Sequence, residues 1–210
     1  MAVRGSPRQA RAMKSRFPLS LVLWMASASC SAQIVAVRLY DHAGLSGTVA
    51  SRLTESADRA FGHSGIHVIW RYCGGMPTRI PERTCQSDIS FNEIVVSLET
   101  TRAHNSSSRA SSCMGHASVS PAGGYSASVF VPTVREQAAG FGVGFDLLIG
   151  YAVAHEVGHC LLGPGHSYAG LMRGVWNRKD AEEIARVSLH LTSQERRKAV
   201  ARIAWLNQGR

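Results

Sequence analysis

The stretch HEVGHCLLGPGHSYAGLM at residues 155–172 constrains this chain more than any other part of its sequence. It overlaps an apolar run at residues 145–157 that is long enough for a buried helix. On such a helix His155 and His159 share one face, because they are four residues apart, and both imidazoles can reach one metal ion. Glu156 lies beside the same face. We therefore predict that Glu156 is a general base toward a water molecule at that metal.

The predicted helix should end at Gly163-Pro164-Gly165, because proline cannot continue a helix and glycine permits the positive φ that turns the chain back. His166 follows this turn directly, so its imidazole can return to the metal as a third ligand. Three protein ligands leave one coordination position open for water, and this open position distinguishes catalytic zinc sites from structural ones. The pattern therefore predicts a catalytic zinc site.

This stretch resembles the extended zinc motif of the metzincin metallopeptidases, H-E-x-x-H-x-x-G-x-x-H followed by a turn with a methionine beneath the metal. The chain departs from that motif by one extra residue before the glycine, which the flexibility of Gly163 and Gly165 can absorb. The resemblance implies a zinc endopeptidase in which Glu156 is the base and Met172 is a structural floor to the site, not a ligand. The matching positions are His155, Glu156, His159, Gly163, His166 and Met172.

A carboxylate further along the chain is the alternative third ligand, as in the gluzincin metallopeptidases. The charged stretch that offers such carboxylates is more typical of the solvated start of a helix, so we favour His166 and expect one zinc ion per chain. The alternative candidates are Asp180, Glu182 and Glu183.

Residues 1–32 have the pattern of a signal peptide. Residues 1–16 hold five basic and no acidic residues, and residues 17–26 form an apolar stretch too short to span a bilayer as a helix. Small residues then favour cleavage after Ala32. We predict residues 1–32 as signal peptide, with Met13 as an alternative start, and residues 33–210 as the metallopeptidase catalytic domain.

The predicted location is therefore secreted or periplasmic, and a lipid anchor at Cys30 is the weaker alternative. Five of the 23 basic residues belong to residues 1–16, which leaves 18 basic against 14 acidic residues from the formal net charge of +9. This mild excess does not indicate nucleic-acid binding, because no basic cluster is interleaved with aromatic residues. We expect neither a nucleic-acid partner nor a stable membrane span, and the sequence leaves the oligomeric state open.

Four cysteines remain beyond residue 32, and an even number in an exported chain favours disulfides. Cys73 and Cys85 enclose a short loop rich in proline and glycine, and we predict that they are bridged. Cys113 and Cys160 are then the remaining pair, for which a bridge and two free thiols are both open.

The rest of the chain reads as one α+β domain. We expect strands at residues 34–40, 66–73 and 93–98, with a helix at residues 49–61 that makes the first two strands parallel. Two short strands at residues 114–121 and 125–131 precede the zinc helix, and a capping box at residues 192–195 starts a terminal helix that packs on the sheet.

The resemblance to metzincins implies a single domain with a twisted mixed sheet, a catalytic zinc helix, a Met-turn and a C-terminal helix. In metzincins an edge strand just before the zinc helix binds the extended substrate by backbone pairing. We place the substrate cleft there and interpret His116 as an ordinary strand residue. Trp176 is expected either to pack under the site or to line the pocket beside it.

The leading interpretation is an exported zinc endopeptidase that acts on peptide or protein substrates. One alternative is a zinc-binding protein of the same fold that cleaves nothing efficiently, although Glu156 would have no use in such a site. Another is a metallohydrolase of a non-peptide amide. The sequence separates these poorly, because loops decide substrate preference.

Overall fold

The computed structural model describes residue 1 and residues 33–74, 83–90, 92–102 and 113–208. The predicted signal peptide, with Met13, Cys30 and the cleavage position after Ala32, lies outside the described residues apart from Met1. No helix within the described part of the chain combines the length and the apolar character that crossing a lipid bilayer requires.

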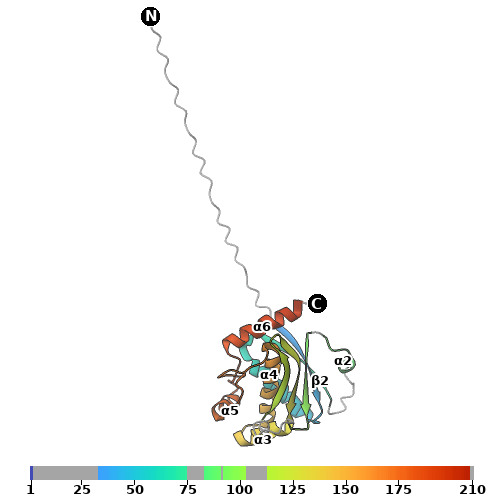
Figure 1. Ribbon diagram of the computed structural model, residues 1–210. Helices are drawn as coiled ribbons and strands as arrows, with labels where there is room; N and C mark the ends of the chain where they lie inside the picture. Colours follow the sequence, from blue (N-terminus) through green and yellow to red (C-terminus); the bar gives the residue numbers. More distant parts are fainter. Residues whose placement is uncertain (2–32, 75–82, 91, 103–112, 209–210) are drawn as a thin grey trace. The chain divides into compact units, whose positions relative to one another are not determined.

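One mixed sheet organises the described residues (Figure 1). Its order is β2-β1-β3-β5-β4, in which β4 alone runs antiparallel to its neighbour. This agrees with the predicted parallel pair around a helical crossover and with the predicted hairpin. The strands are β1 (Gln33–Asp41), β2 (Ile66–Cys73), β3 (Glu93–Glu99), β4 (Gly115–Ser120) and β5 (Gly123–Phe130).

The helices α1 (Gly47–Phe61) and α4 (Phe145–Leu162) pack against each other and on the sheet. They cross closely at Gly150, where an added Cβ would lie 2.5 Å from the carbonyl oxygen of Leu53. Leu53 itself is fully buried in α1. Burying such a side chain contributes roughly 1.5–3 kcal/mol, and the absence of a side chain at Gly150 lets the backbones of α4 and α1 approach closely.

Two helices of the described chain were not predicted from the sequence. The helix α3 (Val131–Phe141) starts where β5 ends, with Pro132 in its first turn and Gly142 in the left-handed conformation just after it. The prediction that the strand continues to Val131 is therefore wrong by one residue, and the helix beyond it went unnoticed. The short helix α2 (Arg83–Gln86) lies in the segment between β2 and β3.

The C-terminal part forms α5 (Arg178–Ala185) and α6 (Ser193–Gln208). The predicted capping box is present at the start of α6, where the amides and side chains of Thr192 and Glu195 bond reciprocally. The helix α6 packs chiefly against α4 and also contacts β1. It therefore reaches the sheet only in part, and its main support is the zinc helix.

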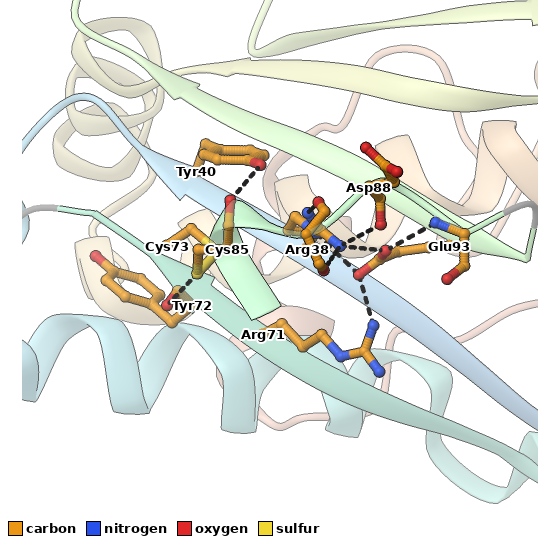
Figure 2. A network of polar contacts seen from close by, with 10 residues as sticks. Arg38, Tyr40, Arg71, Tyr72, Cys73, Cys85, Asp88 and Glu93 are labelled. Carbon is orange, nitrogen blue, oxygen red and sulfur yellow. Dashed lines mark hydrogen bonds and ion pairs between the residues drawn. A yellow bond between two sulfur atoms is a disulfide. The ribbon is translucent and has the colours of Figure 1, made fainter. Parts of the chain in front are cut away.

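The disulfide Cys73–Cys85 joins the end of β2 to α2, as predicted. Figure 2 shows the polar network beside it, in which buried Arg38 of β1 pairs with Glu93 at 2.7 Å and also donates to the carbonyl oxygen of Ser87. Burial raises the pKa of the Glu93 carboxyl. Hydrogen bonds from Arg38 and Arg71 lower this pKa by more, so it lies below its ordinary value. The network and the disulfide together fasten the α2 segment to the sheet.

Of the two outcomes that the sequence left open for Cys113 and Cys160, the bridge is wrong, because both thiols are free. Cys160 is buried on the side of α4 that faces β5, with its sulfur 3.8 Å from the carbonyl oxygen of Ser126. Cys113 instead donates to the carbonyl oxygen of Gly115 at 2.8 Å and lines a cleft beside α4. The two side chains point toward different neighbours. Being the two cysteines left over therefore does not make them a disulfide.

Candidate metal centre

The helix α4 presents two histidines to one spot, as its spacing predicts. His155 and His159 are both buried, with 9% and 8% of their surface exposed. Their Nε2 atoms lie 3.1 Å apart. The helix is buried along almost its whole length, so neither ring can swing away from this position.

His166 completes a cluster of three imidazoles. Its Nε2 lies 3.3 Å from that of His159, and one ring nitrogen from each of the three residues falls within 4.8 Å of the others. Two nitrogens bound to zinc at about 2.05 Å with tetrahedral angles would be roughly 3.3 Å apart. The spacing of the cluster therefore suits a tetrahedral zinc ion.

Carbonyl groups set the tautomers of the two helical rings. The Nδ1 of His155 lies 2.7 Å from the carbonyl oxygen of Leu171, and the Nδ1 of His159 lies 3.3 Å from that of Gly163. A carbonyl only accepts, so each Nδ1 carries the proton and each Nε2 keeps its lone pair. Two lone pairs that face each other at 3.1 Å repel, and a metal ion bound between them would remove this repulsion.

Burial favours the neutral form of both rings. It lowers the pKa of His155 to about 4, and it lowers the pKa of His159 as well. Neutral imidazole is the form that binds zinc. Both rings are therefore in the form that can bind a metal ion at neutral pH.

Compared with the metzincin pattern, this motif has one extra residue, which is accommodated at the end of α4. The helix runs on to Leu162, and its last turn closes by the amide of Gly163 donating to the carbonyl oxygen of His159 at 2.8 Å. Gly163 then turns back with a φ of 89°. This turn brings His166 to the other two rings despite the extra residue.

Met172 lies directly against the helix between the two histidines. An added Cβ at Gly158 would come within 2.4 Å of its sulfur, so the Met172 side chain in this position requires the space that glycine leaves. Trp176 packs edge-on against the ring of His155 at 5.6 Å and also lines the cleft. Both roles expected for Trp176 are thus combined in one position.

Glu156 is buried, with 5% of its surface exposed, and lines the same cleft as the three imidazoles. Its Oε2 has no hydrogen-bond partner among the described residues. Burial raises the pKa of this carboxyl to about 8. Gly115 of β4 lies so near that an added Cβ would be 2.5 Å from Oε1. An unpartnered acceptor beside three lone pairs fits a site that holds a metal ion and a water molecule.

The cleft has a volume of about 530 Å³. The edge strand β4 forms one side of it and includes His116, which is an exposed strand residue as expected. The lining of the cleft also includes Gln137 and Phe141 of α3, the helix that was not predicted from the sequence. The cleft therefore lies at the strand where we expected the substrate.

The carboxylates considered as alternative ligands do not join the imidazole cluster. They begin α5, as expected, but the expectation of a wholly solvated start is wrong for Asp180, which is buried. Asp180 completes a capping box with Asn177 and forms an ion pair with Arg173 at 3.3 Å. Its Oδ2 thus accepts from both Arg173 and the amide of Asn177 and helps to hold the loop that follows His166.

No protein-family model matches the chain, and no curated protein matches it. Among solved structures, the fold is similar to that of archaemetzincin from Methanopyrus kandleri, solved at 1.5 Å resolution, with a TM-score of 0.51 and 15% sequence identity. The similarity covers 82% of this chain and 97% of the archaemetzincin chain. The predicted single-domain α+β fold with a mixed sheet is therefore confirmed, and it is similar to the fold of archaemetzincin.

Proposed function

We propose that the chain is a zinc-dependent endopeptidase that binds one zinc ion through His155, His159 and His166. The observation that carries the proposal is the placement of the Nε2 atoms at 3.1 and 3.3 Å, with the protons of two rings committed to carbonyls. The likeness in fold to archaemetzincin supports the same class.

The residues of the cleft divide the chemistry between them. When bound, zinc lowers the pKa of a coordinated water to about 7 and polarises the carbonyl of the scissile bond. Glu156 accepts the proton of the attacking water at its free Oε2 and delivers it to the leaving amine. The low-dielectric surroundings that raise the pKa of this carboxyl also favour its holding the proton between the two steps.

A peptide substrate is favoured by the outer strand of the sheet. β4 ends the strand order, and within the described residues no strand pairs with its outer edge. An extended peptide can add to such an edge by backbone hydrogen bonds, which would carry it past the imidazole cluster. Met172, packed against Gly158, then serves as the floor under the metal.

Two other functions remain as alternatives: zinc binding without efficient cleavage, and hydrolysis of a non-peptide amide. Glu156 argues against the first, because a buried carboxylate without a partner costs stability and has no role at a purely structural site. We also propose that the chain is exported, secreted or periplasmic, which the Cys73–Cys85 disulfide and the signal-like residues 1–32 support.

The test is digestion of a diverse peptide library by purified protein, with added zinc and with a chelator, followed by mass spectrometry of the products. Cleavage at internal bonds that requires zinc and stops with the chelator is the expected result. A zinc-loaded protein that cleaves no peptide would instead favour the zinc-binding alternative. Activity on a non-peptide amide alone would favour the second alternative.

A further inference from the structure

The third imidazole is held differently from the other two. His155 and His159 are buried on α4, and each directs its Nδ1 at a carbonyl oxygen. His166 lies exposed on the loop after the helix, and its Nδ1 has no hydrogen-bond partner within the described part of the chain. The position of this ring therefore depends on the backbone that carries it and on its packing against the rings of His155 and His159, whose centroids lie 5.5 and 4.8 Å from its own.

That backbone is paired with the segment after Met172. The amide of Ser167 donates to the carbonyl oxygen of Met172 at 2.9 Å, and Ser167 and Arg173 form an isolated bridge. The ring of His166 lies flat on Gly174, where an added Cβ would be 2.8 Å from its Cγ. Both paired segments belong to the same loop, so the pair needs an anchor in the rest of the domain.

Glu195 provides such an anchor. The hydroxyl of Ser167 donates a hydrogen bond to its Oε1, across 28 residues of sequence. Its Oε2 accepts from the amide of Thr192 at 2.7 Å, within the capping box that starts α6. Glu195 is buried, with 8% of its surface exposed. A buried carboxylate with both oxygens occupied has little freedom to move.

This anchor links the loop that carries His166 to the helix that carries the other two histidines, by way of α6. The helix α6 packs against α4, which carries the other two imidazoles. Ser167 is the next residue after His166, so the Ser167–Glu195 bond ties the third ring to the helix that supports the first two. Partners that hydrogen-bond directly to a metal ligand typically contribute a factor of about 10–100 to metal affinity, and the Ser167–Glu195 bond acts on the residue next to such a proposed ligand.

We propose that Glu195, acting through the hydroxyl of Ser167, is a positioning residue for the third zinc ligand, His166. The inference rests on the proposed function, since it assumes that His166 binds the metal. The C-terminal helix thereby becomes part of the metal centre, although none of its residues belongs to the imidazole cluster.

The test measures zinc affinity by competition with a chromophoric chelator. Ser167→Ala should lower the affinity about 10- to 100-fold, whereas Ser167→Thr, which keeps the hydroxyl, should retain it. Thr192→Ala is the matched control, because it weakens the same cap but leaves the Ser167–Glu195 bond in place. It should lower the melting temperature while the zinc affinity stays close to that of wild type.

Two results would overturn the inference: unchanged zinc affinity in Ser167→Ala, or an equal loss in Thr192→Ala, which would indicate general destabilisation. The His166→Ala variant separates this failure from failure of the proposed function. If His166→Ala retains wild-type affinity, the proposed ligand set is wrong. If it loses affinity, Ser167→Ala added to it should cause no further loss, because the ring to be positioned is gone.

Discussion

The Nδ1 of His155 lies 2.7 Å from the carbonyl oxygen of Leu171, the residue before Met172. This bond links the helix α4 to the turn beneath it, and the indole nitrogen of Trp176 donates to the same oxygen at 3.3 Å. One carbonyl thus fixes the tautomer of a proposed ligand and the position of the aromatic ring beside it. The helix α4 supplies two imidazoles of the candidate metal centre, and the turn at Leu171 holds one of them in place.

Replacing His166 tests the ligand set. His166→Ala should lower zinc affinity at least about 100-fold, because losing a ligand costs more than losing an outer partner. Glu182→Gln and Glu183→Gln are the controls, since these carboxylates stand outside the imidazole cluster. Competition titration against a chelator measures all three variants. Wild-type affinity in His166→Ala, with a loss in either control, would move the third ligand to α5.

The cysteines give a prediction that can be checked on protein from its native compartment. Non-reducing peptide mapping should find Cys73 linked to Cys85, and Cys113 and Cys160 as free thiols. Of the two free thiols, Cys113 should react with an alkylating reagent first, because Cys160 is almost fully buried. A Cys113–Cys160 linkage, or four free thiols, would contradict the structure.

Gly115 is expected to be essential for the position of Glu156. Gly115→Ala places a Cβ 2.5 Å from Oε1, so the carboxylate must move. A displaced catalytic group typically costs about 100-fold in rate, and zinc content should be unchanged because no ligand moves. Gly140→Ala is the matched control, since an added Cβ there meets nothing within 4 Å. Equal peptidase rates for the two variants would refute this role of Gly115.

The stability of the metal-free protein should depend on pH through Glu156. Burial raises the pKa of this carboxyl from 4.5 to about 8, so its contribution to folding is complete below pH 4.5 and declines as pH rises toward 8. Glu156→Gln removes this decline. The free energy of unfolding of the variant minus that of wild type should therefore increase between pH 5 and pH 8. The increase should reach up to a few kcal/mol, at about 1.4 kcal/mol per pKa unit.

Denaturant unfolding in the presence of a chelator measures this difference at each pH. His155 acts in the opposite direction, because burial lowers its pKa from 6.5 to about 4 and its contribution declines as pH falls. That decline is common to both proteins and cancels in the comparison. A difference between wild type and Glu156→Gln that stays constant with pH would show that the carboxyl is not held protonated.

Local patterns in the sequence were sufficient for the elements that carry the rings. Four-residue spacing within an apolar run predicted the helix with His155 and His159, and the helix-ending glycines predicted the return of His166. Short, largely apolar runs predicted the strands. These signals succeed because each depends on neighbours in sequence and on one buried face.

Contacts between distant segments could not be predicted in this way. The helix α3 follows a strand without a loop between them, and its amphipathic pattern is weak. It was therefore not predicted from the sequence. The sequence could not decide whether Cys113 and Cys160 pair, because that depends on the direction in which each side chain leaves the folded backbone. The structure shows both thiols free. The Ser167–Glu195 bond joins a loop to a helix start, and neither residue type signals the other.

The central claim is that Glu156 moves the proton at a zinc site built by three histidines. The most direct measurement compares the peptide-cleavage rates of wild type and Glu156→Gln, both loaded with zinc and matched for metal content. The account predicts equal zinc content and a rate lower by about 100- to 10,000-fold in the variant, because general base catalysis is lost while the ligands remain. Equal rates at equal zinc content would contradict it.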